Sequence, residues 1–153
     1  MKTIRIETSL GELASSYNVQ IQRGVVHQLG EAVRIELNPS RVAILTDSTV
    51  DELHGNAVRE SLCAAGYHPI TFSFPAGEAN KTFATVGSIL EFLADERLTR
   101  SDLIVALGGG VPGDIAGFAA SIYLRGIRYI QVPTTILAAV DSSVGGKTGA
   151  DLP

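Results

Sequence analysis

Glycines and charged side chains gather in two segments of the chain where they could bind phosphate. In the first, Gly108, Gly110 and Gly113 satisfy the G-x-G-x-x-G spacing and directly follow an apolar run at residues 103–107. Glycines let a backbone approach a diphosphate, and the start of the next helix supplies N–H groups and a positive dipole end. The spacing therefore predicts a nucleotide-binding loop. A glycine-rich turn that binds nothing is the alternative.

The glycine loop departs in two ways from the usual dinucleotide pattern. An acid that binds ribose is expected about 20 residues after the glycines, but the next predicted strand ends at Pro133 without one. Asp47 and Glu78 are the candidates for this task, although Asp47 could simply cap a helix and Glu78 could be a solvated loop acid. Pro112 also removes one N–H donor from the loop.

The second segment covers residues 141–149 and contains Asp141 and Lys147. Gly-Gly-Lys-Thr resembles the end of a P-loop, but the glycine required at position 141 is replaced by Asp141. A lysine beside two glycines is still a natural anion contact. A solvated loop lysine is the alternative interpretation.

Apolar patterning places these segments in an alternating order of strands and helices. Continuous or alternating apolar runs predict strands at 3–8, 17–23, 41–46, 69–74, 103–107 and 128–132. Helical spacing predicts helices at 25–33, at 50–65 and, near the end of the chain, through Val140. It also predicts a helix that begins at Thr82, with Phe83, Val86, Leu90 and Leu93 facing inward. A further helix is predicted after Gly113, with Ile115, Phe118, Ala119, Ile122 and Tyr123 facing inward. The order predicts an α/β fold: a Rossmann-like parallel sheet with helices on both faces, plus an N-terminal β-hairpin that turns near Gly11.

The composition excludes several classes of protein. The chain has 153 residues, enough for one domain, and 45% hydrophobic against 18% charged residues argues against disorder. The net charge of −4 argues against nucleic-acid or anionic-membrane partners. No apolar run approaches the roughly 20 residues that span a bilayer, and no signal sequence is evident, so a cytoplasmic protein is expected. The single cysteine, Cys63, is expected to be a buried small hydrophobe, and the histidines lack metal spacing.

Several motifs occur in order over about half of the chain and resemble one family. They are Gly77-Glu78-x-x-Lys81, Leu107-Gly108-Gly109-Gly110-Val111-x-Gly113-Asp114, Gly117-Phe118-Ala119-Ala120, Arg125-Gly126, Val132-Pro133-Thr134-Thr135 and Val140-Asp141-Ser142-Ser143-Val144-Gly145-Gly146-Lys147-Thr148. The set is highly specific and resembles 3-dehydroquinate synthase of the shikimate pathway.

The resemblance implies an enzyme of aromatic amino acid biosynthesis, a lyase that uses NAD⁺ and a divalent metal, zinc or cobalt. The enzyme converts 3-deoxy-D-arabino-heptulosonate 7-phosphate, a phosphorylated sugar acid, to 3-dehydroquinate and phosphate, usually as a homodimer. The family's metal ligands lie in a helical C-terminal domain that this sequence does not contain. Residues 1–153 are therefore expected to form the NAD-binding N-terminal domain, which binds NAD but does not turn over alone.

The resemblance also assigns roles to individual residues. The residues implied to bind NAD are Asp47, Ser48, Thr49, Gly77, Glu78, Lys81, Gly109, Gly110, Val111, Gly113, Asp114, Thr134, Thr135 and Lys147. Those implied to bind substrate are Arg125, Thr134, Thr135, Asp141 and Lys147, with Asp141 and Lys147 also implied in catalysis. No metal ligand is assigned. In some members of the family the arginine acts across the dimer interface.

Three alternatives remain at this point. A related sugar-phosphate cyclase would tend to carry a bulkier residue at Gly113. A polyol or alcohol dehydrogenase of the same superfamily would carry serine at Val111 and lack the Asp141–Lys147 pattern. A non-catalytic nucleotide-binding module would share the fold without the chemistry.

Overall fold

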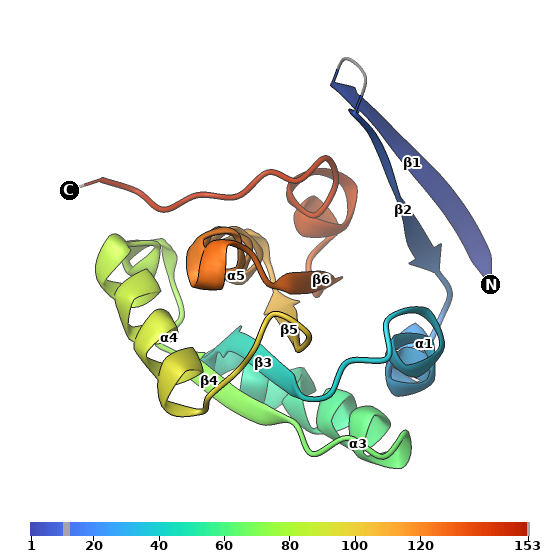
Figure 1. The fold of residues 1–153 in the computed structure, drawn as a ribbon, viewed down its shortest axis with the longest axis horizontal. Coiled ribbons are helices and arrows are strands. Elements are labelled where there is room, and N and C mark those ends of the chain that lie inside the picture. The colour runs from blue at the N-terminus through green and yellow to red at the C-terminus, as the bar shows by residue number, and fades with distance from the viewer. Residues whose placement is uncertain (11–12, 153) are drawn as a thin grey trace.

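The computed structural model describes residues 1–10 and 13–152, which form two sheets (Figure 1). The strands are β1 (Lys2–Leu10), β2 (Leu13–Ile21), β3 (Val42–Asp47), β4 (Ile70–Phe74), β5 (Leu103–Gly108) and β6 (Arg128–Pro133). The longer helices are α1 (Leu29–Glu36), α3 (Asn56–Ala64), α4 (Phe83–Asp95) and α5 (Gly110–Ile122). Shorter helical segments are η1 (Val25–Gln28), α2 (Ser48–Val50), η2 (Asp51–Gly55), η3 (Glu78–Asn80), η4 (Tyr123–Arg125) and η5 (Ala138–Ser142).

The main sheet has four parallel strands in the order β4-β3-β5-β6, and β1 and β2 form a separate antiparallel hairpin. The predicted α/β class is therefore confirmed, including the hairpin. Gly11, where the hairpin turn was expected, lies outside the described residues. The second strand begins earlier than predicted, at Leu13, and the first helical region extends further, to Glu36.

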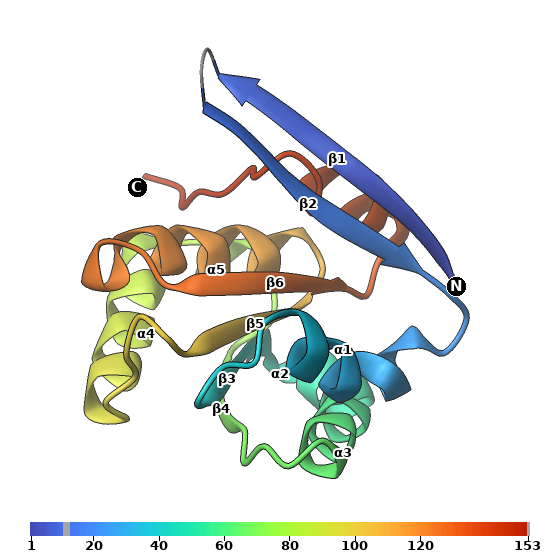
Figure 2. The same cartoon turned by 45° about the vertical axis from the view of Figure 1, so that its right-hand side comes forward.

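The two central strands are buried on both faces because helices cover both sides of the sheet (Figure 2). Ala43 and Leu45 of β3 face a core shared with α4 and α5, whereas Val42 and Ile44 face a core shared with α1 and α3. This explains why the two central strands are continuously apolar instead of alternating. No helix in the described residues is long and apolar enough to cross a membrane.

Two polar residues fix the edge of the sheet where the strands begin. Asp102 is 1% exposed and accepts hydrogen bonds from the backbone N–H groups of Arg41 and Thr99 at 2.9 and 2.6 Å. The Tyr123 hydroxyl lies 2.9 Å from the carbonyl oxygens of both Leu93 and Leu98, and it can donate to either of them. Burial raises the pKa of Tyr123, which keeps the hydroxyl protonated as a donor.

Three side chains predicted to face inward are exposed instead. Phe83 and Ile122, the first residue of α4 and the last residue of α5, are 50% and 46% exposed. The Phe83 ring still meets the Phe118 ring edge-on, with centroids 5.6 Å apart. Cys63 is exposed because α3 turns Val58, Ser61 and Leu62 toward the core and its other side to solvent.

Candidate functional site

The predicted site residues converge because all four parallel strands end at one edge of the sheet. Asp47 is paired with Phe74, and Gly108 with Pro133, so the loops that follow start side by side. The Ser48 hydroxyl accepts a hydrogen bond from the Ala76 N–H at 3.3 Å. In open α/β sheets, ligands bind at this carboxyl edge.

The glycine loop brings the start of α5 to this edge without a side-chain cap. Gly109 is the N-cap residue, and no side chain bonds to the first turn of the helix. By contrast, Asp47 caps α2 and Thr82 caps α4 through side-chain oxygens. The first N–H groups of α5 therefore have no side-chain partner, the arrangement that favours an anion.

Two of the glycines have close neighbours within the loop region. A Cβ on Gly108 would overlap the Pro112 ring, so this proline fits only because position 108 has no side chain. A Cβ on Gly113 would lie 2.7 Å from Gln131 Oε1, closer than ordinary packing allows. Pro112 itself is buried in the first turn of α5, where a missing N–H disturbs no helical hydrogen bond.

The two candidate ribose acids take different positions. Asp47 is 9% exposed, and its carboxylate accepts a hydrogen bond from the Val50 N–H at 2.9 Å, as expected for a helix cap. Glu78 follows Gly77 in the adjoining loop, and its side chain is 70% exposed. Its carboxylate lies 3.8 Å from the Lys81 ammonium, so the acid is open to a ligand on one side.

Lys81 and Asp114 form the best-defined charge pair at this edge. Lys81 Nζ lies 2.9 Å from Asp114 Oδ2, and both side chains are less than one-fifth exposed. The hydrogen bond to Asp114 raises the pKa of Lys81, and the charges of Asp114, Asp151 and Glu78 act in the same direction. The pair joins the 75–81 loop to the first turns of α5 and presents both donors and acceptors, which suit ribose hydroxyl groups.

The predicted threonines lie directly against the glycine loop. The Thr134 N–H donates to the Gly108 carbonyl at 2.9 Å. Thr135 Oγ1 accepts from the Ala138 N–H at 3.1 Å and so starts the next helical turn. A Cβ on Gly109 would lie 3.3 Å from the Thr135 methyl group, which leaves little room for any side chain there.

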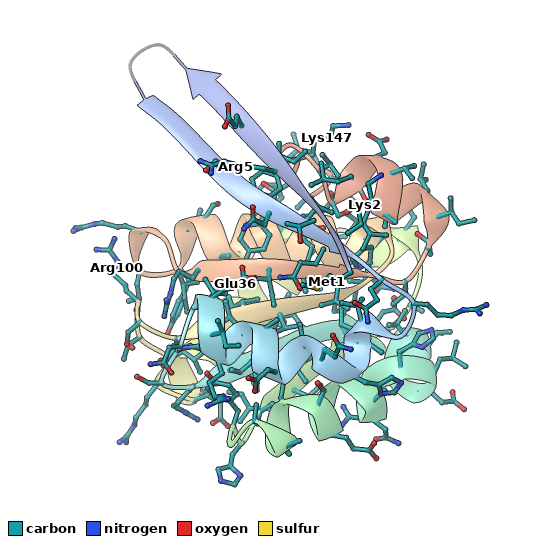
Figure 3. All side chains as sticks on the ribbon, turned by 90° about the vertical axis from the view of Figure 1, so that its right-hand side faces the viewer. Met1, Lys2, Arg5, Glu36, Arg100 and Lys147 are labelled. Atoms are coloured by element: carbon teal, nitrogen blue, oxygen red, sulfur yellow. The ribbon has the colours of Figure 1, made fainter. Side chains whose placement is uncertain are left out.

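Asp141 and Lys147 meet each other in the segment beyond the threonines. Lys147 Nζ donates to Asp141 Oδ1, and both side chains are more than half exposed. Lys147 lies close to the hairpin, far from Arg100 at the other edge of the sheet (Figure 3). The Gly145 N–H donates to the Tyr17 hydroxyl at 2.7 Å, which ties this segment to β2.

Arg125 is the one predicted site residue that the fold does not bring to this edge. It follows α5, whose 13 residues separate it from the glycine loop by about 20 Å at 1.5 Å per residue. Leu124 and Arg125 both have positive φ, 50° and 64°, which is unfavourable for residues with a side chain. The turn therefore holds Arg125 outward at the opposite edge of the sheet.

Asp151, which no sequence motif indicates, lies beside Lys81. Its N–H donates to the Lys81 carbonyl at 2.8 Å, and its carboxylate lies 3.9 Å from Lys81 Nζ. The two residues are far apart in the chain, and no local pattern relates them. Family motifs could not indicate Asp151 either, because they end at Thr148.

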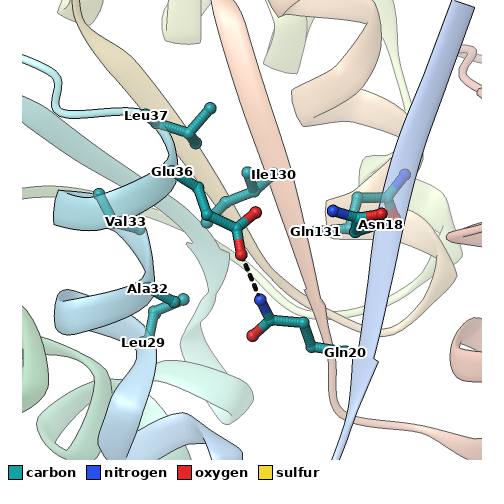
Figure 4. A pocket seen from close by; sticks show the side chains of 9 residues that line it. All are labelled: Asn18, Gln20, Leu29, Ala32, Val33, Glu36, Leu37, Ile130 and Gln131. Carbon is teal, nitrogen blue, oxygen red and sulfur yellow. Dashed lines mark hydrogen bonds between the residues drawn. The ribbon is translucent and has the colours of Figure 1, made fainter. Parts of the chain in front are cut away.

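A cavity of about 140 Å³ lies away from this edge, between β2, α1 and β6 (Figure 4). Asn18, Gln20 and Glu36 supply polar groups to it, and the Gln20 amide donates to the Glu36 carboxylate. None of the predicted cofactor residues lines this cavity. The carboxyl edge of the sheet therefore remains the candidate site, because the charge pair and the uncapped helix lie there.

The described residues fit one of the two implied cofactors, the dinucleotide NAD, but not the other, a divalent metal. The uncapped start of α5, the glycine backbone and the Lys81–Asp114 pair suit a dinucleotide. Within residues 1–10 and 13–152, no group of three or more His, Cys, Asp or Glu side chains is placed to hold a metal ion. These residues therefore do not fit a divalent metal.

A parallel sheet with a glycine loop and an uncapped helix at its carboxyl edge defines a nucleotide-binding domain of the Rossmann-like class. Residues 71–153 match the family described as 3-dehydroquinate synthase N-terminal, and the chain belongs to that family. The chain is 53% identical over 140 residues to 3-dehydroquinate synthase from Paracoccus denitrificans (strain Pd 1222). That match covers 92% of this chain but only 38% of the relative's length.

Solved structures of cyclases share the same fold. A 2-deoxy-scyllo-inosose synthase complexed with carbaglucose-6-phosphate, NAD⁺ and Co²⁺ is 28% identical with a TM-score of 0.83, over 97% of this chain and 40% of the other. A 2-epi-5-epi-valiolone synthase from Streptomyces hygroscopicus subsp. jinggangensis 5008, with NAD⁺ and Zn²⁺ bound, is 30% identical with a TM-score of 0.75. This second match covers 95% of this chain and 39% of the other.

Proposed function

We propose that the chain is the nucleotide-binding part of a 3-dehydroquinate synthase that converts 3-deoxy-D-arabino-heptulosonate 7-phosphate to 3-dehydroquinate and phosphate. The observation that most strongly supports this function is that Lys81, Asp114, the glycine loop and the two threonines lie together at one edge of the sheet. Family membership and the NAD⁺ bound in two cyclase structures support this function.

Each group at this edge has a task in holding the dinucleotide. Gly109 and Gly110 present bare backbone and the start of α5 to the diphosphate. Lys81 and Asp114 hold each other in place, so that the ammonium donates to and the carboxylate accepts from ribose hydroxyl groups. The dinucleotide that these residues would hold would supply reversible hydride chemistry to the site.

Four residues beyond the glycine loop are assigned to the substrate in this proposal. Thr134 and Thr135 would contact both the nicotinamide and the substrate, and Asp141 and Lys147 would contact the substrate. Lys147 is exposed enough to exchange its Asp141 partner for a substrate phosphate or carboxylate. Because the Asp141 carboxylate lies beside Lys147, it holds the ammonium in place until a substrate phosphate or carboxylate replaces it as the partner of Lys147.

We further propose that the intact enzyme is a cytoplasmic homodimer of the shikimate pathway with a divalent metal, zinc or cobalt, held outside this chain. Arg125 lies at the opposite edge of the sheet from the proposed nucleotide site, so its substrate contact is assigned to the site of a second copy. The chain spans about 38% of the length of the curated relative it matches, and it is expected to release no phosphate from the heptulosonate phosphate alone.

A related sugar-phosphate cyclase is the second candidate, because the cyclase structures share this fold. The glycine at position 113 argues against this candidate, because such cyclases would tend to carry a bulkier residue there.

Calorimetric titration of the chain with NAD⁺ tests the proposed function. Saturable binding of one NAD⁺ per chain is expected, together with no phosphate release from the heptulosonate phosphate. Turnover by the chain alone would refute the proposal that this chain binds NAD⁺ but cannot complete the reaction by itself. If the folded chain does not bind NAD⁺ at millimolar concentration, the result would favour a non-catalytic module with another role.

A further inference from the structure

The hydroxyl of Ser142 is a buried polar group that the fold leaves without a hydrogen-bond partner. Within the described residues, only three buried side-chain atoms share this property: Tyr67 Oη, Thr71 Oγ1 and Ser142 Oγ. Tyr67 packs in the core beside α1 and α3, and Thr71 lies on edge strand β4. Because a buried hydroxyl without a partner is unfavourable, each such group in a native structure needs an explanation.

Ser142 lies beside the start of α5, the helix that has no side-chain cap. It is the last residue of η5, which packs against α5 (Figure 2). A Cβ built on Gly110 would lie 3.7 Å from Ser142 Oγ, so the hydroxyl faces the first residue of α5 with no side chain between them. This is the same helix start that has no side-chain cap.

The neighbouring serine shows that the fold can satisfy a hydroxyl in this turn. Ser143 Oγ donates to the Ala138 carbonyl at 2.6 Å, and the Ser143 N–H donates to the same carbonyl at 3.0 Å. Ser143 is therefore committed to the turn itself. Ser142, one position earlier, has the same side chain and makes no such bond.

We propose that Ser142 is a further nucleotide-binding residue, whose hydroxyl donates a hydrogen bond to the diphosphate of bound NAD⁺. The inference rests on the proposed function and deepens it. The Ser142 hydroxyl lies beside Gly110, the first residue of α5, and the start of this helix is where a diphosphate would bind. A hydroxyl bonded to an anion makes a stronger hydrogen bond than one bonded to a neutral acceptor, so binding would relieve the unpaired group.

Two alanine variants of the whole chain separate this role from a structural one. In Ser142→Ala the dissociation constant for NAD⁺, measured by calorimetry, should rise about ten-fold or more, since the lost bond involves a charged acceptor. The urea midpoint of the same variant should stay unchanged or rise, because an unpaired buried hydroxyl is removed. Ser143→Ala should show the reverse: a lower urea midpoint and a dissociation constant within about two-fold of the original, since its bond lies inside the turn.

Titration with ADP-ribose locates the contact, because this ligand keeps the diphosphate and lacks nicotinamide. The loss in Ser142→Ala should be equally large for ADP-ribose and NAD⁺, whereas a loss confined to NAD⁺ would overturn the assignment to the diphosphate. If the original chain and Ser142→Ala bind NAD⁺ equally, the Ser142 proposal is wrong and the proposed function stands. If the original chain does not bind NAD⁺, both are wrong.

Discussion

Lys81 is the residue on which the charges of the candidate site converge. Three carboxylates lie within 3.9 Å of its ammonium, and the shortest contact, to Asp114, is 2.9 Å. The pair is mostly buried, so each partner depends on the other for its hydrogen bond. Lys81 therefore serves the stability of the chain as well as the proposed contact with ribose.

Replacing Lys81 with Met should lower the free energy of unfolding by about 1–3 kcal/mol at pH 8, as for other hydrogen bonds to charged groups. The pKa of Lys81 is raised in the folded chain, so its contribution is complete below the ordinary lysine value and is lost as pH rises through the folded value. The gap between the original chain and Lys81→Met should therefore narrow above about pH 10.4.

Urea unfolding between pH 8 and pH 11 measures this gap, with Lys2→Met as a matched control because Lys2 is exposed on β1. The control should unfold like the original chain throughout. A gap for Lys81→Met that is absent at pH 8, or that stays constant to the highest pH, would contradict the assigned ion pair.

At the scale of elements, residues 148–151 form a C-terminal segment that crosses α5 toward α4 (Figure 1). The Gly149 N–H donates to the Asp114 carbonyl at 3.3 Å, and Asp151 forms a parallel bridge with Thr82. The Thr148 methyl group occupies the space left by Gly117 on α5, where a Cβ would overlap it. The segment thus holds together both partners of the Lys81–Asp114 pair.

A double-mutant cycle tests this packing. Gly117→Ala should destabilise the chain by about 1–3 kcal/mol through overpacking, because the new methyl group meets Thr148. Adding Thr148→Ala should recover part of that loss, so the two changes should be non-additive in urea unfolding. Strictly additive effects would show that the C-terminal segment does not pack on Gly117.

The sequence predicted the central elements better than the helix ends. The apolar runs that became β3 and β5 fit their strands to within one residue, because burial on both faces leaves no polar positions. Phe83 and Ile122 followed helical spacing yet are exposed, because spacing does not tell which residues at a helix end still reach the core. The contacts of Lys81 with Asp114 and Asp151 could not be predicted, because they join residues that are far apart in the chain and that no local pattern relates.

At the scale of the whole molecule, the hairpin of β1 and β2 stands apart from the two cores (Figure 2). Among residues 1–7 and 16–25, none belongs to either core cluster. The side-chain links from β2 to the body that the described residues show are those of Tyr17 with Gly145 and Gln20 with Glu36. An isolated two-stranded hairpin is marginally stable in water, so this part should open independently of the sheet.

Hydrogen exchange should reveal two levels of protection. Amides of β1 and β2 should exchange through local opening, whereas those of β3 and β5 should exchange only when the whole chain unfolds, because both faces of these strands are buried. Mass spectrometry of peptides from each strand measures the difference. Equal protection in hairpin and sheet would show that the hairpin belongs to the same cooperative unit.

The most direct test of the nucleotide site is an amide NMR titration of the ¹⁵N-labelled 153-residue chain with NAD⁺. The largest shifts should fall on residues 108–114, on the 75–81 loop and on residues 134–142, the segments that meet at the carboxyl edge of the sheet. Amides around the cavity formed by Asn18, Gln20 and Glu36 should stay unchanged. Shifts confined to that cavity, or no shifts at millimolar NAD⁺, would contradict the assignment of this edge as the cofactor site.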